Sequence, residues 1–186
     1  AIDGVMDFHT LQPTLSRSTK VDFSGNALAR YSSANNEKPG HVNFNIGLNK
    51  WAFTSSATFG DYDDLKMGSN GPEAYTRPDY QIRDENGNDI AVSNPDPNVQ
   101  VPSGYDQLNL MQKVRFKPNE AWDFSYGFHF SETSDVPRYD RLILKNSSNV
   151  FTSAEWYYGP QKWMMHALNI HYTKESKLFD QFKVTA

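Results

Sequence analysis

The sequence predicts an all-β protein, an antiparallel up-and-down transmembrane β-barrel, of which this chain carries about seven strands with long extracellular loops. Three observations predict this fold. Hydrophobic and polar residues alternate with a period of two along most of the chain, which is typical of strands with two unlike faces. Short and long connections alternate, as in barrels with short turns at one rim and long loops at the other. Aromatic residues form 14% of the 186 residues, although the mean hydropathy is only -0.70.

The first three predicted strands are residues 20–33, 41–49 and 51–60. In each of them, residues of one parity are mostly hydrophobic and their neighbours are polar or small, with the weakest contrast in 20–33. Because successive side chains of a strand point to opposite faces, the hydrophobic residues share one side of a sheet. These hydrophobic faces consist of Phe23, Ala27, Ala29 and Tyr31; Val42, Phe44, Ile46 and Leu48; and Trp51, Phe53, Ala57 and Phe59.

The last four predicted strands are residues 105–117, 120–132, 163–172 and 178–186. Segment 120–132 shows the clearest alternation of the chain, and 178–186 shows a weaker one. The three stronger segments extend the same two-faced sheet. Their hydrophobic faces consist of Leu108, Leu110, Val114 and Phe116; Trp122, Phe124, Tyr126, Phe128 and Phe130; and Leu168, Ile170 and Tyr172.

The connections between the predicted strands follow a regular order of lengths. The short ones are Asn49-Lys50, 117–120 and 173–177, and the longer ones are 34–40, 62–104 and 133–150. A connection as long as 62–104 is unusual in a compact soluble domain, but the outer loops of membrane receptors pack on one another. Within it, Asn86-Gly87 predicts a hairpin turn. We therefore expect the short turns at one rim of the barrel and the long loops at the other.

The predicted strands are long enough to cross the apolar layer of an outer membrane. From Trp122 to Phe130 the chain rises about 26 Å at about 3.3 Å per residue. With a tilt of about 40° this projects to roughly 20 Å, close to the roughly 25 Å apolar band of such barrels. Aromatic girdles would contain Trp51, Trp122, Tyr31 and Tyr172. A soluble β-sandwich would alternate in the same way, but strand length and loop asymmetry favour the barrel.

The composition excludes several classes of function. The chain contains no cysteine, which rules out disulfides, zinc–cysteine sites, iron–sulfur clusters and a thiol nucleophile. Its net charge of -4 disfavours a surface that attracts phosphates, so we expect no nucleic-acid partner. No stretch reaches the roughly 20 apolar residues of a transmembrane helix. We expect no enzyme, because no nucleophile elbow, Ser/His/Asp constellation or glycine-rich phosphate loop is legible.

Three segments resemble a known receptor family. Residues 1–10 (AIDGVMDFHT) resemble the end of the plug domain of TonB-dependent outer-membrane receptors, although Asp3 stands where glycine is usual. Residues 103–116, followed by 134–142 (SDVPRYDRL) and 157–163 (YYGPQKW), resemble the early barrel of the haem, haemoglobin, transferrin and lactoferrin receptor group in its Bacteroidetes-like form. The resemblance implies the end of the plug and the plug–barrel joint at 1–12, and the first strands of the barrel at 13–186.

The same resemblance implies a location and a function. In this family the barrel has about 22 strands and a plugged lumen, so the chain would supply about the first seven strands and would be completed by other segments. Residues 1–4 lack the features of a signal peptide, so we expect a processed chain, a piece of a longer one, or a cytosolic protein. The implied function is active uptake, at the cell outer membrane, of an iron-bearing cargo such as haem or a haemoprotein.

The resemblance also implies the partners and the role of haem. The partners are a TonB-type energy-transducing complex, outer-membrane lipid and a surface lipoprotein. Haem would be transported as cargo, and no intrinsic cofactor is expected. Two hypotheses of other classes stand beside the receptor: a barrel that serves as a structural or interaction subunit of an envelope complex, and a soluble β-rich module that binds carbohydrate.

Five residues are candidate substrate-binding residues. Tyr75, Arg77 and Tyr80 lie in the longest connection, where exposed aromatic and arginine side chains favour recognition. His41 and His129 are predicted on the polar face near the loop ends of their strands, where an imidazole could meet haem iron. For each of these residues the competing interpretation is structural, namely loop packing or hydrogen bonding in the lumen wall.

Two charged clusters are interpreted as structural. Asp84–Asp89 is predicted to be a turn, because its glycine is the fourth residue and a calcium loop needs glycine at the sixth. Arg138 and Arg141 are predicted to form a salt-bridge cluster with Asp135 and Asp140 at the outer rim. No metal site is expected, because no pair of histidines has close ligand spacing.

Overall fold

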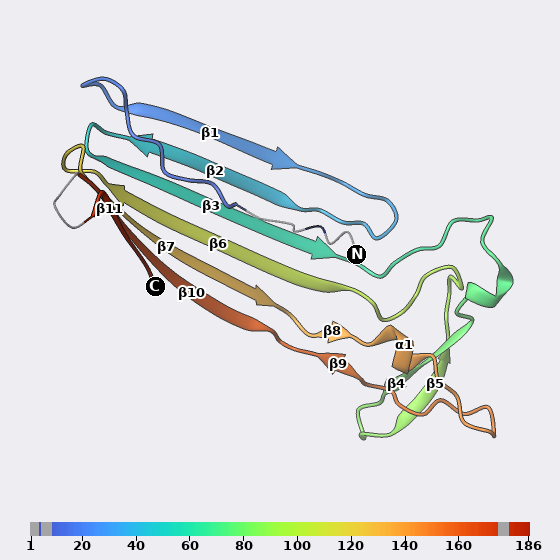
Figure 1. Ribbon diagram of the computed structural model, residues 1–186. Helices are drawn as coiled ribbons and strands as arrows, with labels where there is room; N and C mark the ends of the chain where they lie inside the picture. The colour runs from blue at the N-terminus through green and yellow to red at the C-terminus, as the bar shows by residue number, and fades with distance from the viewer. Residues whose placement is uncertain (1–3, 5–8, 175–178) are drawn as a thin grey trace.

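The computed structural model describes residue 4 and residues 9–174 and 179–186, and its main element is one antiparallel sheet (Figure 1). In the described chain this sheet has seven strands in the order β1-β2-β3-β6-β7-β10-β11, and it is open, with β1 and β11 at its edges. The prediction of an all-β, antiparallel protein is confirmed. The strands are β1 (Asp22–Ala29), β2 (Gly40–Gly47), β3 (Trp51–Tyr62), β6 (Tyr105–Phe116), β7 (Trp122–Thr133), β10 (Lys162–Thr173) and β11 (Gln181–Thr185).

The period-two pattern located these strands well, because each of the seven predicted segments overlaps one of them. Strands β3 and β6 pair without interruption from Trp51 opposite Phe116 to Tyr62 opposite Tyr105. The four central strands β3, β6, β7 and β10 each contain 12 residues. Strands of soluble proteins are usually about half as long, about 5–6 residues.

The register places the hydrophobic residues of neighbouring strands side by side on one face, here called the apolar face. In the described chain this face is largely open, since 72% of Phe23, 51% of Phe59 and 59% of Met164 is exposed. Aromatic rings stack along it, with the ring centroids of Trp51 and Phe116 4.2 Å apart. One row across the face consists of Phe23, Ile46, Phe53, Val114, Tyr126 and Leu168.

The opposite face, here called the polar face, is crossed by residues 10–16. The Lys113 ammonium donates a hydrogen bond to the Thr10 hydroxyl at 2.6 Å, and Pro13 is fully buried. The Ser16 amide donates to the carbonyl oxygen of Leu48 at 3.1 Å. The N-terminal segment therefore lies against the polar face and leaves the apolar face open.

The short connections at 48–50 and 117–121 lie at one end of the sheet and the two longest connections at the other, as predicted (Figure 1). Residues 63–104 contain the 3-10 helix η1 (Glu73–Tyr75) and the hairpin of β4 (Asp79–Arg83) and β5 (Asp89–Ser93). Gly87 lies in the turn of this hairpin with a φ of 82°, so the predicted Asn86-Gly87 turn is confirmed. Residues 134–161 contain β8 (Val136–Pro137), helix α1 (Tyr139–Leu142) and β9 (Tyr157–Tyr158).

The two long connections pack on each other, and together residues 63–104 and 134–161 are here called the rim cluster. Arg83 in β4 forms an ion pair with Glu155 at 3.3 Å. Among the described residues, most of the buried hydrophobic ones lie in this cluster rather than in the sheet: Leu142, Phe151 and Ala154, beside Ala52 of β3.

Within the described residues, the helices are too short or too polar to cross a membrane. The expected end of the plug at 1–12 lies outside the described residues, except for residue 4 and residues 9–12.

Candidate functional site

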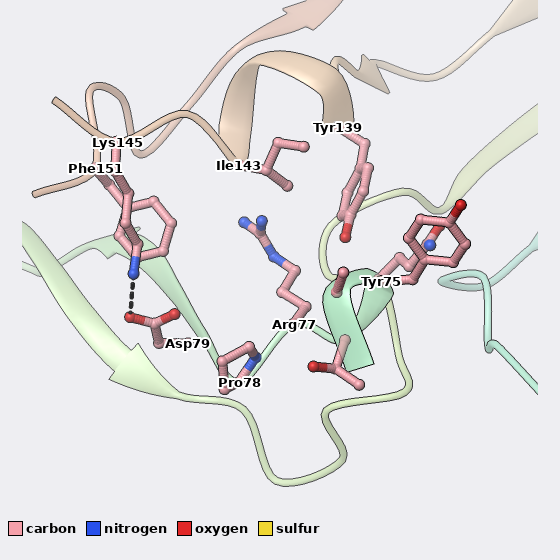
Figure 2. Close-up of a pocket in the computed structure, with 11 residues that line it drawn as sticks. Tyr75, Arg77, Pro78, Asp79, Tyr139, Ile143, Lys145 and Phe151 are labelled. Atoms are coloured by element: carbon pink, nitrogen blue, oxygen red, sulfur yellow. Dashed lines mark hydrogen bonds and ion pairs between the residues drawn. The ribbon is translucent and has the colours of Figure 1, made fainter. Parts of the chain in front are cut away.

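A cavity of about 400 Å³ lies within the rim cluster, between the two long connections (Figure 2). This volume is within the range of ligand pockets, roughly 300–1,000 Å³. The connection that contains β4 contributes residues around its start, and the connection that contains α1 contributes the helix and the segment after it. The lining includes Tyr75, Arg77, Tyr139, Ile143, Lys145 and Phe151.

Arg77 lies two residues before the start of β4, and both its amide and its carbonyl group are hydrogen-bonded. Its amide donates to the carbonyl oxygen of Pro97 at 2.7 Å, and its carbonyl oxygen accepts a hydrogen bond from the Asn94 side chain at 2.8 Å. The same Asn94 nitrogen donates to the carbonyl oxygen of Val99 at 2.9 Å, and Asn94 is 7% exposed. With its backbone held in this way, Arg77 directs its side chain into the cavity (Figure 2).

The Arg77 guanidinium is buried among aromatic rings. Only 4% of the residue is exposed, and its Nη2 donates to the carbonyl oxygen of Leu142 at 3.1 Å. The guanidinium carbon lies 5.1 Å from the ring centroid of Tyr139 and 5.7 Å from that of Phe151, within the range of cation–π attraction. Among the described residues, Arg77 takes part in no ion pair and its buried Nε has no hydrogen-bond partner.

Burial also affects the electrostatics of Arg77. Desolvation lowers the pKa of the Arg77 guanidinium, and Tyr139 and, less strongly, the Asp79 and Asp64 carboxylates oppose this effect. An arginine still remains protonated in proteins, so the cavity contains a desolvated positive charge.

The second cation in the lining, Lys145, already has a carboxylate partner. Its ammonium lies 2.7 Å from the Asp79 carboxylate and 4.3 Å from the ring centroid of Phe151 (Figure 2). The charges of Lys145 and Asp79 cancel, so Arg77 gives the lining an excess of one positive charge. Such a lining can bind an anionic group by charge-assisted hydrogen bonds and hold an apolar body against the rings.

The structure brings two of the five candidate residues together. Tyr75 and Arg77 both line the cavity, although Arg77 is buried and not exposed as a loop contact would be. Tyr80 lies in β4 opposite Val92 and is not part of this lining.

The two candidate histidines lie in the sheet and not in the rim cluster. His41 is in β2, and its ring nitrogens contact the Thr58 hydroxyl at 2.7 Å and the Asn43 amide nitrogen at 2.9 Å. His129 is in β7, opposite Met111 and Met165. Both share the polar face, as predicted, but two strands separate them, so the structure does not combine them into one site with Arg77.

Sequence reasoning missed Tyr139, Lys145 and Phe151 as parts of the cavity. They are more than 60 positions away from Arg77, and no local pattern marks them as its neighbours. The salt-bridge cluster predicted at the rim is present in part. Asp140 forms ion pairs with Arg138 at 2.7 Å and with Arg141 at 3.6 Å.

In the described part of the chain, no group of three or more His, Cys, Asp or Glu residues is placed to hold a metal ion. The Asp84–Asp89 segment is a turn, since the Asp84 carboxylate accepts hydrogen bonds from the amides of Asn86 at 2.9 Å and Asn88 at 2.7 Å. Comparison of the chain with protein families, curated proteins and solved structures finds no match.

Proposed function

We propose that this chain forms part of the barrel wall and outer loops of a TonB-dependent receptor in the outer membrane, which takes up an iron-bearing cargo. The observation that carries the proposal is the contrast between the two faces of one sheet. The apolar face is wide, aromatic and open, and the polar face is crossed by the chain's own N-terminal segment. In a barrel of this kind, lipid covers the first face and the lumen lies behind the second.

Exposing the hydrophobic side chains of the apolar face to water would carry a large free-energy cost. Keeping a Leu or Phe side chain out of water contributes about 1.5–3 kcal/mol. Among the described residues, the apolar face exposes Phe23, Val42, Phe59, Leu110, Met164 and Leu168 by 38% or more. Contact with lipid tails removes this cost without another protein layer.

The polar side chains of the apolar face are suited to lipid because they bond to one another. The Tyr126 hydroxyl and the His166 Nδ1 lie 2.6 Å apart, and the Ser55 hydroxyl donates to the Gln112 side-chain oxygen at 2.5 Å. Polar groups without partners would be costly in hydrocarbon. The edge strands β1 and β11 also have backbone groups that need hydrogen-bond partners in hydrocarbon. The proposal therefore includes further strands that pair with β1 and β11 and close the barrel.

The N-terminal segment fits the joint between a plug and its barrel. Residues 10–16 lie on the face that would line the lumen and reach β1 at the rim of short turns. A plug that precedes them would occupy the lumen. The rim cluster would then lie on the extracellular side, where it could contact haem or a haemoprotein.

The experiment that tests the proposal is purification of the intact protein with and without detergent, followed by electrophoresis of unheated and boiled samples. We expect detergent-dependent solubility and a migration that changes on boiling. A monomer soluble in plain buffer, with no heat-dependent migration, would contradict the membrane assignment. Titration of the receptor with haem, read from the Soret band, tests the cargo: the absence of a shift would exclude free haem.

A further inference from the structure

We infer that the rim-cluster cavity is a binding site for a small organic carboxylate with an apolar or aromatic body, and that Arg77 binds the carboxylate. The cavity and its charges stand independently of the membrane. Only the interpretation of this ligand as cargo rests on the proposed function.

Arg77 is a buried cation with unused bonding capacity. A guanidinium has five N–H donors in a planar fork that matches a carboxylate. One Arg77 nitrogen donates to the Leu142 carbonyl oxygen, and the Tyr139 side chain also hydrogen-bonds to the guanidinium. Nε still has no partner among the described residues, although only 4% of the residue is exposed. A buried charge without a counter-ion is unfavourable, so a bound carboxylate would satisfy both the charge and the donor.

The charges of the lining favour a ligand with a single negative charge. The acidic side chain in the lining, Asp79, forms an ion pair with Lys145 at 2.7 Å, so its charge is already balanced, although it also attracts Arg77 at longer range. One positive charge therefore remains, which a single carboxylate balances. A phosphate dianion would bring a second negative charge next to the Asp79 carboxylate, so the arrangement favours a carboxylate.

Aromatic and aliphatic side chains surround Arg77 in the lining. Tyr139 and Phe151 present their rings on either side of Arg77, and Ile143 adds an aliphatic surface (Figure 2). These side chains offer contact area to an apolar or aromatic body but no further charge. The cavity of about 400 Å³ has room for such a body beside the carboxylate.

The test compares two probes that have the same shape and differ in charge. The intact protein in detergent is titrated calorimetrically with phenylacetate and with its neutral amide, phenylacetamide. We expect phenylacetate to bind at least tenfold more tightly, because only the carboxylate pairs with Arg77. In Arg77→Gln this preference should disappear, and in Ile143→Trp, which fills the cavity and leaves Arg77 in place, neither probe should bind specifically.

The Ile143→Trp variant also measures the partition of each probe into detergent, and a circular dichroism spectrum equal to that of the unmodified protein shows that both variants are folded. Equal binding of the two probes to the unmodified protein, or binding of neither, would overturn the inference. So would an unchanged preference in Ile143→Trp. A protein that prefers phenylacetate but does not insert into lipid would contradict the proposed function and leave the site intact. An inserted protein without the preference would contradict the site alone.

Discussion

Asn45 and Thr14 hold each other by two hydrogen bonds across the polar face. The Thr14 amide donates to the Asn45 side-chain oxygen at 2.9 Å, and the Asn45 side-chain nitrogen donates to the Thr14 carbonyl oxygen at 3.0 Å. One side chain of β2 therefore satisfies both backbone groups of a residue in the N-terminal segment. Without Asn45, the amide and carbonyl groups of Thr14 would lose these partners, so Asn45 anchors this part of the segment on the sheet.

The close approach of this segment predicts that Gly47→Ala destabilises the protein. A Cβ atom at Gly47 would lie 2.6 Å from the Thr14 carbonyl oxygen and 2.9 Å from the Ser16 amide nitrogen. Because the obstacle is backbone, the segment must shift, at a cost of about 1–3 kcal/mol in the free energy of unfolding. Denaturant unfolding and hydrogen exchange of the Ser16 amide measure the effect. The matched control is Gly40→Ala in the same strand, where nothing lies within 4 Å; equal effects of the two changes would refute the account.

The ion pair between Lys145 and Asp79 predicts a small coupling between the two long connections. We expect a double-mutant cycle of Lys145→Met and Asp79→Asn to give about 0.2–1 kcal/mol of favourable coupling, because both side chains are partly exposed, by 26% and 40%. The more exposed pair of Lys162 and Glu132, at 3.2 Å, serves as the control and should couple less. Thermal unfolding of the rim cluster supplies the measurement, and a Lys145–Asp79 coupling no larger than that of the control would contradict the prediction.

The hairpin turn at Asp84 predicts a loss of local order in acid. The backbone N–H of Asn88 is the largest of the effects that hold the pKa of Asp84 below its ordinary value. A carboxyl group with a lowered pKa stabilises the folded turn fully above its unfolded pKa, and this stabilisation is lost as the pH falls through the lowered value. Hydrogen exchange of the Asn88 amide should therefore accelerate, relative to its intrinsic rate, as the pH falls below about 4. Asp84→Asn retains an acceptor oxygen without the titration, so an identical pH profile in this variant would rule out the explanation.

The apolar face predicts a large penalty for a charge at Leu168, near the middle of β10. In lipid, Leu168→Arg should cost about 2–4 kcal/mol, as arginine does at the midplane of an outer-membrane barrel. On a soluble protein, a residue that is 40% exposed should tolerate the change within about 0.5 kcal/mol. Reversible unfolding from lipid vesicles measures the difference, with Leu168→Met as the hydrophobic control. A penalty as small as that of the control would count against lipid contact.

Much of the sheet was predictable from the sequence, because hydrophobic and polar residues alternate along most of its strands. Segment 105–117 gives β6 and segment 120–132 gives β7 to within two residues. A strand with two unlike faces carries its own signal, and no distant residue is needed to read it. Strands β4 and β5 were not predicted, because each has only five residues. The turn between them was predicted from Asn86-Gly87.

The cavity was predictable only in part. Tyr75 and Arg77 stood out as residue types that favour recognition, whereas Lys145 and Phe151 reach the cavity only through the packing of two loops. For the same reason the burial of Arg77 could not be foreseen: the Leu142 carbonyl oxygen that it contacts is 65 positions away. Contacts between long connections depend on tertiary packing, which leaves no periodic signal in the sequence.

The most direct test of the account is whether the two faces of β10 meet different solvents. Met164 lies on the apolar face and Met165 on the polar face, they are 59% and 45% exposed, and the chain contains no cysteine. Single cysteines introduced along β10 can therefore carry a spin label in the intact protein in lipid bilayers. We expect labels at even positions such as Met164→Cys to be relaxed by lipid-soluble oxygen, and labels at odd positions such as Met165→Cys by a water-soluble nickel complex. Equal access of the nickel complex to both positions would contradict the central claim that lipid covers the apolar face.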